Sequence, residues 1–307
     1  MDWDVVVVGS TNIDLMLTVP RHPHPGETLI GSSGELFAGG KGANQAVAAA
    51  RLGARTAMVG AVGDDANSAV ALSELVAADV DLSAMRRVPG PTGLAVVTLS
   101  DDGENTIIVV PGANAAVTAE AVASASDVIR AAKVLLLQVE IPLAAVVLAA
   151  EIAASAGARV VLNLAPACPM ALETLRLADP LVLNEHEVAL LLGWLDDAEI
   201  EAASDRAAAL HAARKLRAHG VPSVVVTLGK EGVAGVEADG EWSLPAHVVQ
   251  VRDTTGAGDA FVGALAARLA KGATLQDAAE DANRVAAYSV QMLGAQASYP
   301  WKDDPLP

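Results

Sequence analysis

VLLLQVEIPLAAVVLAAEIAASAGARVVLN, residues 134–163, contains two short apolar runs with a longer apolar segment between them. The runs Val134–Leu137 and Arg159–Asn163 are typical of buried strands, and Leu143–Ala156 has the length of a helix. Two strands that are joined through a helix lie parallel in one sheet, with a right-handed crossover. The stretch therefore predicts a parallel sheet covered by helices.

The same alternation extends in both directions from this stretch. Asp4–Gly9 is a run of valines that ends in glycine, which indicates a buried strand at the start of an α/β fold. Further strands are predicted at 56–60, 181–183 and 223–227, and a hairpin at 233–236 and 241–244. Helices are predicted at 42–51, 67–77, 119–132, 185–192, 205–219, 258–270 and 275–292. We predict an α/β fold with a Rossmann-like, mostly parallel central sheet flanked by helices.

Two insertions interrupt the alternation. Residues 15–36 hold several prolines and glycines between short apolar pieces, which excludes a helix. Residues 93–100 and 105–110 flank Asp101-Asp102-Gly103-Glu104, a turn signal typical of a hairpin. A lone hairpin is only marginally stable in water, so we expect the insertions to pair in one small β-sheet lid. The predicted main domain comprises residues 1–14, 37–91 and 112–307, and the predicted lid comprises residues 15–36 and 92–111.

Composition and charge exclude several classes of protein. The 307 residues are 52% hydrophobic, enough for a full core in which alanine, valine and leucine do most of the packing. The formal net charge of −17 argues against a nucleic acid or an anionic membrane as partner, since both need a basic face. The single cysteine, Cys168, excludes an internal disulfide and a cysteine-rich metal site.

The sequence has no evident targeting or membrane segment. Its first residues, Met1-Asp2-Trp3-Asp4, are acidic where a signal peptide would be basic. The most apolar region, 134–154, is interrupted by Gln138, Glu140 and Glu151, which makes it unsuitable for spanning a bilayer. We therefore predict a cytoplasmic protein.

The stretch Asp253-Thr254-Thr255-Gly256-Ala257-Gly258-Asp259 carries the clearest functional signal. A glycine-rich turn that opens a helix directs backbone N–H groups toward one point, where the helix dipole favours an anion such as phosphate. A carboxylate at Asp259 would repel an anion, so its presence suggests a base that removes a proton beside the phosphate. This combination predicts a kinase that lacks the G-x-x-x-x-G-K-[ST] sequence of a P-loop.

Polar residues follow several of the predicted strands. The carboxyl ends of parallel strands meet at one edge of a sheet, where α/β proteins bind ligands. Each such residue alone has a plain structural interpretation, as a turn residue, a cap or a partner of a neighbour. Their common position is a better indication of a site than any one of them. These residues are Asn12, Asp14, Glu140, Asn163, Asn184 and Thr227.

Three further segments leave a structural and a functional interpretation open. The turn Gly39-Gly40-Lys41-Gly42-Ala43-Asn44 is either a capped tight turn or a backbone cradle in which Lys41 and Asn44 bind a polyhydroxylated ligand. The segment 227–232 either begins a hairpin or holds nucleotide phosphates or ribose. Asn184 and Glu187 either form a helix-capping pair or lie near a hydrated Mg²⁺, which takes few direct protein ligands.

Together these motifs resemble the ribokinase family, also called the phosphofructokinase-B family of carbohydrate kinases. The resemblance extends from Gly9-Ser10-Thr11-Asn12-Ile13-Asp14 to the segment 294–301, and covers nearly the whole chain. Two stretches match the signatures of the family, the diglycine region at Gly39-Gly40 and the stretch 253–259. The resemblance implies transfer of the γ-phosphate of ATP to the 5-hydroxyl of D-ribose. It also implies a homodimer that is joined through the lid sheets.

The resemblance assigns roles to residues, position by position. Asp259 would be the general base, and the anion hole would be formed by Gly256, Ala257 and Gly258. Sugar hydroxyls would be held by Asn12, Asp14, Gly40, Lys41, Gly42, Asn44, Glu140 and Asp259. ATP would lie along Asn184, Thr227, Gly229, Gly232, Gly258 and Asn283, and Mg²⁺ near Glu187. A monovalent cation, usually K⁺, would be bound by Asp253, Thr255, Ser289, Met292, Gly294 and Ser298.

Other functions remain open from the sequence. A kinase of deoxyribose, a nucleoside or a sugar phosphate would use the same motifs. A sugar phosphate would need extra cations near the lid, for which Arg21, Arg86 and Arg87 are candidates. Asn283 stands where the family often has a bulkier residue such as histidine against the adenine, which bears on nucleotide preference. A sugar-binding sensor without catalysis is the alternative from another class, and the intact Asp259 argues against it.

Overall fold

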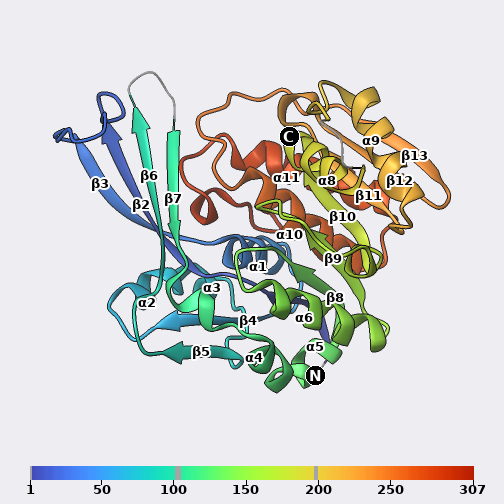
Figure 1. Cartoon of the computed structure of the whole chain (residues 1–307), viewed down its shortest axis with the longest axis horizontal. Coiled ribbons are helices and arrows are strands. Elements are labelled where there is room, and N and C mark those ends of the chain that lie inside the picture. Colours follow the sequence, from blue (N-terminus) through green and yellow to red (C-terminus); the bar gives the residue numbers. More distant parts are fainter. Residues whose placement is uncertain (1, 101–104, 197–199) are drawn as a thin grey trace.

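The computed structural model describes residues 2–100, 105–196 and 200–307. Within these ranges a sheet of nine strands forms the centre of the molecule (Figure 1). The order is β13 (Gly240–Leu244), β12 (Val233–Glu237), β11 (Val224–Thr227), β10 (Ala178–Asn184), β9 (Arg159–Asn163), β8 (Ala132–Leu137), β1 (Trp3–Val8), β4 (Thr56–Gly63) and β5 (Met85–Val88). Neighbours from β11 to β5 are parallel, and the hairpin β12–β13 is antiparallel at one edge. The predicted fold class is confirmed.

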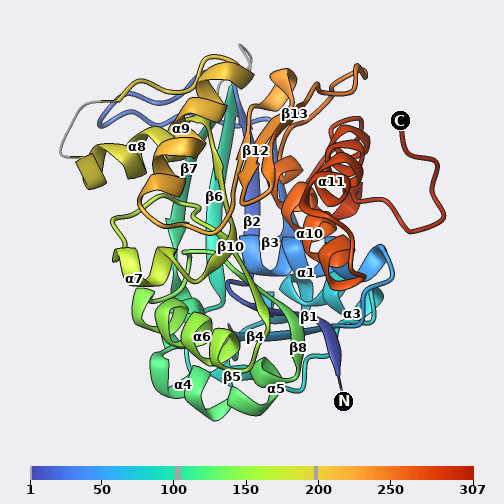
Figure 2. The ribbon, with the colours of Figure 1, turned by 90° about the vertical axis from the view of Figure 1, so that its right-hand side faces the viewer.

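Helices cover both faces of this sheet (Figure 2). One face packs under α4 (Ala119–Ser124), α5 (Ser126–Arg130), α6 (Leu143–Ser155), α7 (Leu172–Leu175), α8 (Glu185–Asp196) and α9 (Arg206–Ala218). The other packs under α1 (Lys41–Arg51), α3 (Ser73–Ala77), α10 (Ala257–Ala270) and α11 (Leu275–Ser289). In β1, Val6 and Val8 face the first core, and Val5 and Val7 face the second. Burial on both faces explains why the strands are continuous apolar runs in the sequence.

A second sheet of four strands stands beside the large one (Figure 1). Its order is β3 (Ser33–Gly39), β2 (Asn12–Val19), β6 (Gly93–Ser100) and β7 (Asn105–Val110). The pairing of β2 with β6 is parallel, and the two outer pairings are antiparallel. β2 follows β1 after three residues, so the two sheets adjoin at Asn12. The predicted turn at 101–104 lies outside the described residues, and the predicted division into two domains stays a prediction.

The structure differs from the sequence prediction at several element boundaries. The strand β5 was not predicted, because its four residues include the exposed Arg86 and Arg87 and show no clear apolar period. The helix expected at 67–77 is two single turns, α2 (Asn67–Ala71) and α3, and the one expected at 119–132 is divided at Ala125. The last helix ends at Ser289 rather than Met292, since the Val290 carbonyl accepts hydrogen bonds from the N–H groups of Arg252 and Asp253.

Three short 3₁₀ helices complete the described elements, namely η1 (Gly112–Ala116), η2 (Gly229–Glu231) and η3 (Gln296–Ser298). Among the helices of the described ranges, none is both long and apolar enough to cross a bilayer.

Candidate active site

The turn before α10 has the conformation that its glycines allow. Gly256 has a φ of 73°, in the left-handed region that glycine enters without steric cost, and it caps α10. Its carbonyl accepts hydrogen bonds from the N–H of Ala260 at 2.8 Å and the Tyr299 hydroxyl at 2.9 Å. The N–H of Ala257 donates to the Thr254 carbonyl at 3.2 Å, within the turn itself. The share of Ala257 in an anion hole therefore stays a prediction, while Gly256 and Gly258 line the cavity described below.

Asp259 lies in the first turn of α10 and is only 7% exposed. Its Oδ2 accepts a hydrogen bond from Asn44 Nδ2 at 2.9 Å, and its Oδ1 accepts one from Gln45 Nε2 at 2.8 Å. Both amides belong to α1, so the turn that opens α1 and the turn that opens α10 meet at this carboxylate. Gln45 was not predicted as a site residue, although it directly follows the segment 39–44.

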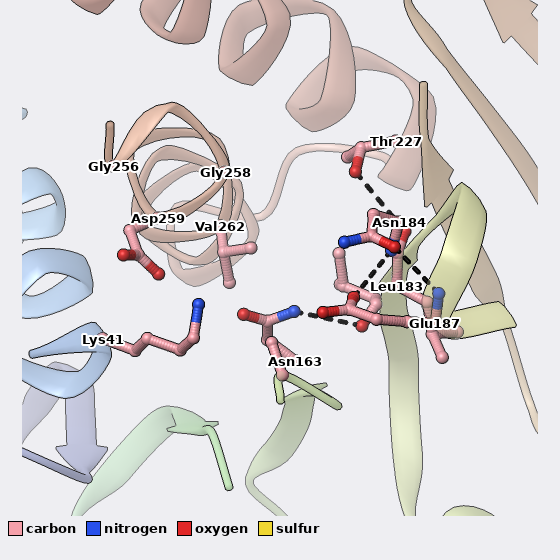
Figure 3. A pocket seen from close by; sticks show the side chains of 12 residues that line it. Lys41, Asn163, Leu183, Asn184, Glu187, Thr227, Gly256, Gly258, Asp259 and Val262 are labelled. Atoms are coloured by element: carbon pink, nitrogen blue, oxygen red, sulfur yellow. Dashed lines mark hydrogen bonds between the residues drawn. The ribbon is translucent and has the colours of Figure 1, made fainter. Parts of the chain in front are cut away.

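Lys41, the first residue of α1, points toward Asp259 (Figure 3). The Asp259 charge raises the pKa of the Lys41 ammonium, with smaller contributions from Glu140 and Glu187, and burial opposes this rise. Lys41 therefore stays a cation at neutral pH. A cation in this position would favour the approach of phosphate groups.

A cavity opens at the carboxyl ends of β9, β10 and β11 (Figure 3). This is the edge of a parallel sheet at which ligands bind. Seven residues that the sequence assigned to a site line this cavity, together with Asn163 from the end of a strand. Four apolar residues that were not predicted complete the lining, namely Ala165, Val182, Leu183 and Val262. The seven are Lys41, Asn184, Glu187, Thr227, Gly256, Gly258 and Asp259.

Asn184 and Glu187 form the capping pair that was one of the two interpretations from the sequence, and their place near Mg²⁺ stays a prediction. Asn184 Oδ1 accepts hydrogen bonds from the N–H groups of His186 at 2.9 Å and Glu187 at 2.8 Å. In return, Glu187 Oε2 accepts one from the N–H of Asn184 at 2.8 Å, which completes a reciprocal capping pair. Both side chains also line the cavity, where burial raises the pKa of the Glu187 carboxyl. Capping therefore holds these two side chains in place beside the cavity.

A second group of polar side chains lies where the small sheet meets α1. Glu140 Oε2 accepts hydrogen bonds from the Ser10 hydroxyl at 2.6 Å and the Lys41 N–H at 3.0 Å. Asn12 Oδ1 accepts one from Asn114 Nδ2 at 2.7 Å. Asp14 lies on β2, and burial, followed by the charges of Glu140 and Asp259, raises its pKa to about 7.

Gly40 and Gly42 allow the backbone to approach closely at this point. Gly40 has a φ of 89°, and a Cβ there would lie 2.7 Å from the Asn12 nitrogen. A Cβ on Gly42 would lie 2.6 Å from the Ser10 nitrogen. These two glycines therefore let α1 begin directly against the junction of the two sheets.

Three residues expected along ATP are not among those lining the cavity. Asn283 lies in α11 and donates from Nδ2 to the Pro245 carbonyl at 2.8 Å. Gly229 begins η2, and Gly232 follows it with a φ of 98°. Their contact with a nucleotide stays a prediction.

The segments expected to hold a monovalent cation lie side by side. Asp253 accepts hydrogen bonds from the N–H of Thr255 at 2.9 Å and from the N–H of Gly294 at 2.8 Å. The hydroxyl groups of Ser289 and Ser298 donate to the carbonyls of Ala286 and Ala295. Carboxylate and carbonyl oxygens are suitable ligands for a hard cation, so these residues fit the expected ion. In the described part of the chain no cluster of three or more His, Cys, Asp or Glu side chains could hold a metal ion.

Comparison with known proteins identifies the family. The model of the pfkB family carbohydrate kinases matches residues 3–302. The chain belongs to this family. This membership confirms the prediction of an ATP-dependent sugar kinase.

Individual relatives cover nearly all of this kinase. It is 39% identical to the ribokinase of Staphylococcus aureus, over 96% of this chain and 96% of that protein. It is 33% identical to the deoxyribokinase of Salmonella typhi, over 97% of this chain and 95% of that protein. The structure of Arabidopsis thaliana ribokinase complexed with ribose and ATP is similar with a TM-score of 0.90 and 35% identity, over 98% of this chain and 97% of that one.

Proposed function

We propose that the protein transfers the terminal phosphate of ATP to the 5-hydroxyl of D-ribose. The observation that carries this proposal is the position of Asp259, a buried carboxylate between the glycine turn of α10 and the polar side chains of α1. The likeness to the ribokinase of Staphylococcus aureus and to the Arabidopsis thaliana ribokinase complexed with ribose and ATP supports the choice of sugar and nucleotide.

Asp259 is suited to act as the general base. Each of its oxygens accepts one hydrogen bond from α1, and a carboxylate oxygen has a second lone pair that can accept the hydroxyl proton of the sugar. As the sugar oxygen attacks the terminal phosphorus, the proton passes to Asp259 and ADP leaves. The hydrogen bonds from Asn44 and Gln45 hold the carboxylate so that little reorganisation is needed during transfer.

Charge on the transferring group would be stabilised from two sides. The N–H groups at the start of α10 and the positive end of its helix dipole would act from the side of Gly256 and Gly258, which line the cavity. The Lys41 ammonium supplies a full positive charge nearby. Mg²⁺ bound to ATP would add a further positive charge near Glu187, and K⁺ beside Asp253 would order the turn. Positioning and electrostatics of this kind are the main sources of catalysis in phosphoryl transfer.

The sugar would bind between β2 and α1. Asp14, Glu140 and Asn12 carry acceptors there for hydroxyl groups, and Asn44 donates to Asp259. The small sheet would cover the bound sugar and exclude water, which would otherwise accept the phosphate.

The small sheet also supports a homodimer. Residues directly opposite each other on paired strands project to the same face of a sheet. A row across the four strands, Leu36, Leu15, Val96 and Ile108, therefore projects away from the face that carries Asp14. Leu36 is 49% exposed and Ile108 is 62% exposed. We propose that a second copy covers this apolar row.

A screen of acceptors tests the proposed function. Pentoses, deoxyribose, hexoses, nucleosides and sugar phosphates are each supplied with Mg²⁺ and ATP, with and without KCl, and ADP formation is followed. We expect D-ribose to have the highest kcat/KM and the product to carry phosphate on the 5-hydroxyl, as judged by ³¹P and ¹³C NMR. ADP formation that no sugar stimulates would contradict the proposal.

Deoxyribose is the second candidate acceptor, because the chain resembles the deoxyribokinase of Salmonella typhi at 33% identity. The two sugars differ only in the 2-hydroxyl, and a site built to bind that hydroxyl rejects the analogue that lacks it. A kcat/KM for deoxyribose above that for ribose would replace ribose as the substrate.

A further inference from the structure

The Tyr299 side chain contacts the glycine turn that precedes α10. Its side chain is only 2% exposed, and its hydroxyl donates to the Gly256 carbonyl at 2.9 Å. The fit is close, because a Cβ added to Gly256 would lie 2.5 Å from this hydroxyl and 2.6 Å from the Ala295 side chain. Gly256 and Tyr299 are therefore complementary in shape as well as in hydrogen bonding.

The peptide group between Gly256 and Ala257 needs such a contact. Glycine has more backbone freedom than any other residue, so the orientation of this peptide depends on its hydrogen bonds, which include the one that the Ala257 N–H donates to the Thr254 carbonyl at 3.2 Å. The Gly256 carbonyl accepts from the Ala260 N–H inside the helix and from Tyr299 outside it. Rotation would move the start of α10, where Gly256 and Gly258 line the cavity. The orientation of this peptide is therefore controlled in part from a residue 43 positions away in the sequence.

The segment around Tyr299 is itself firmly anchored. Arg51, the last residue of α1, is only 6% exposed and donates to the carbonyls of Gln296 and Tyr299. Its guanidinium also pairs with Glu74 and lies 5.0 Å from the centre of the Trp301 ring. An arginine held on several sides at a buried position gives this segment a rigid attachment to α1.

The same segment reaches the other half of the site. Gln296 Nε2 donates to Asn44 Oδ1 at 2.8 Å, and Asn44 in turn donates to Asp259. The segment 296–299 thus contacts Asn44, which bonds to the proposed base, and Gly256, which belongs to the proposed anion-binding turn. A shift of this segment would change the distance between the base and the phosphate seat.

We propose that Tyr299 is a positioning residue for phosphoryl transfer. Its hydroxyl holds the Gly256–Ala257 peptide so that the N–H groups at the start of α10 are in place before the terminal phosphate arrives. This inference rests on the proposed anion-binding role of the turn. It assigns to Tyr299 an effect on turnover, since the hydroxyl donates to the glycine turn itself.

Tyrosine to phenylalanine substitutions test the proposal, because the chain has two tyrosines. Tyr288 in α11 is the matched control, since its hydroxyl donates to Asp304 Oδ2 at 3.5 Å rather than to the turn before α1 or the turn before α10. Loss of one buried hydrogen bond that acts in the transition state corresponds to a rate effect of about tenfold. We expect Tyr299→Phe to lower kcat about tenfold, with the KM for ribose within about twofold of wild type. Tyr288→Phe should leave both constants within about twofold of wild type.

Titration calorimetry with D-ribose separates positioning from partial unfolding. We expect Tyr299→Phe to bind one ribose per chain with unchanged affinity. A kcat within twofold of wild type, or a fall in kcat matched by an equal fall in ribose-binding stoichiometry, would overturn the proposal. Wild-type protein that fails to phosphorylate ribose but accepts another sugar would overturn the proposed substrate only. The two variants are then compared on that sugar by the same criteria.

Discussion

At the scale of single residues, the site depends on acidic side chains held where they have little water. Asp259 is buried and receives two amide hydrogen bonds, whereas Asp14 is partly buried near Glu140 and Asp259 without a comparable compensation. Burying a carboxylate near other carboxylates costs stability, and such costs are concentrated at functional sites. These two residues therefore give contrasting predictions.

Replacing Asp259 by Asn should remove the proton acceptor and retain most of the packing. Loss of a general base lowers turnover by about 10²–10⁴-fold. We expect Asp259→Asn to reduce kcat by this factor in a coupled ADP assay, with ribose affinity almost unchanged. Asp277→Asn is the control, because Asp277 is an exposed acid in the first turn of α11, the same place in its helix. Activity of Asp259→Asn above a tenth of wild type would remove Asp259 from the role of base.

Replacing Asp14 by Asn should stabilise the protein in a pH-dependent way. The folded-state pKa of Asp14 is raised from its usual 3.8 to about 7, so the folded state binds the proton more tightly than the unfolded state does. The contribution of Asp14 to the stability of the folded wild type is therefore most favourable below pH 3.8. It is lost as the pH rises from 3.8 to about 7. At pH 8 we expect Asp14→Asn to be more stable in urea by on the order of 2 kcal/mol. The difference should shrink as the pH falls from 7 to 4.5, and a difference that does not vary with pH would contradict this explanation.

At the scale of elements, two helix N-termini form the site. α1 begins at Lys41 and α10 at Ala257, each directly after a glycine with positive φ. The first turns of the two helices supply Lys41, Asn44 and Asp259, which lie together although their helices are far apart in the sequence. The sequence predicts each turn separately from local glycine and helix patterns. The sequence does not indicate that the two turns lie next to each other in the folded protein.

Gly258 offers a test in which stability and activity should change in different directions. A Cβ at Gly258 meets no protein atom within 4 Å, so Gly258→Ala should fold and gain up to about 1 kcal/mol of stability from the lower backbone entropy of the unfolded chain. Its methyl group would project into the space proposed for phosphate, so we expect kcat/KM for ATP to fall at least about tenfold. Gly256→Ala is the contrasting variant, because a φ of 73° should make it less stable. Full activity in Gly258→Ala would contradict the proposal that the phosphate binds beside Gly258.

At the scale of the whole molecule, the small sheet has two faces with different surroundings. One carries Asp14 toward the site, and the other carries the apolar row of Leu36, Leu15, Val96 and Ile108. An exposed apolar row on a sheet is a common mark of a protein–protein contact. The net charge of −17 opposes association of two copies at a distance, so apolar contact has to supply the attraction.

A charge in the apolar row should separate the proposed dimer. We expect wild-type protein to elute as a dimer in size-exclusion chromatography with light scattering, and Ile108→Asp to elute as a monomer at micromolar concentration. Val109→Asp is the control, because Val109 lies opposite Ala95 and so shares the face of Asp14. A monomeric wild type, or an Ile108→Asp variant that stays dimeric, would contradict this interface.

The sequence by itself determined the layers of the fold and the position of the two glycine turns at the starts of helices. Apolar runs, helix lengths and turn residues are local signals, so the parallel sheet, the hairpin β12–β13 and the place of Asp259 at the start of a helix followed from them. Short elements such as β5 were not predicted, because four residues are too few to show a clear apolar period.

Only the tertiary structure decided what surrounds Asp259 and Gly256. Gln45 contacts Asp259 across 214 positions of sequence, and Tyr299 contacts Gly256 across 43. The end of α11 was likewise decided by a distant contact, the hydrogen bonds that Val290 accepts from Arg252 and Asp253. Such bonds depend on how the chain returns to the same point after several crossovers, and no local periodicity or turn signal carries that information.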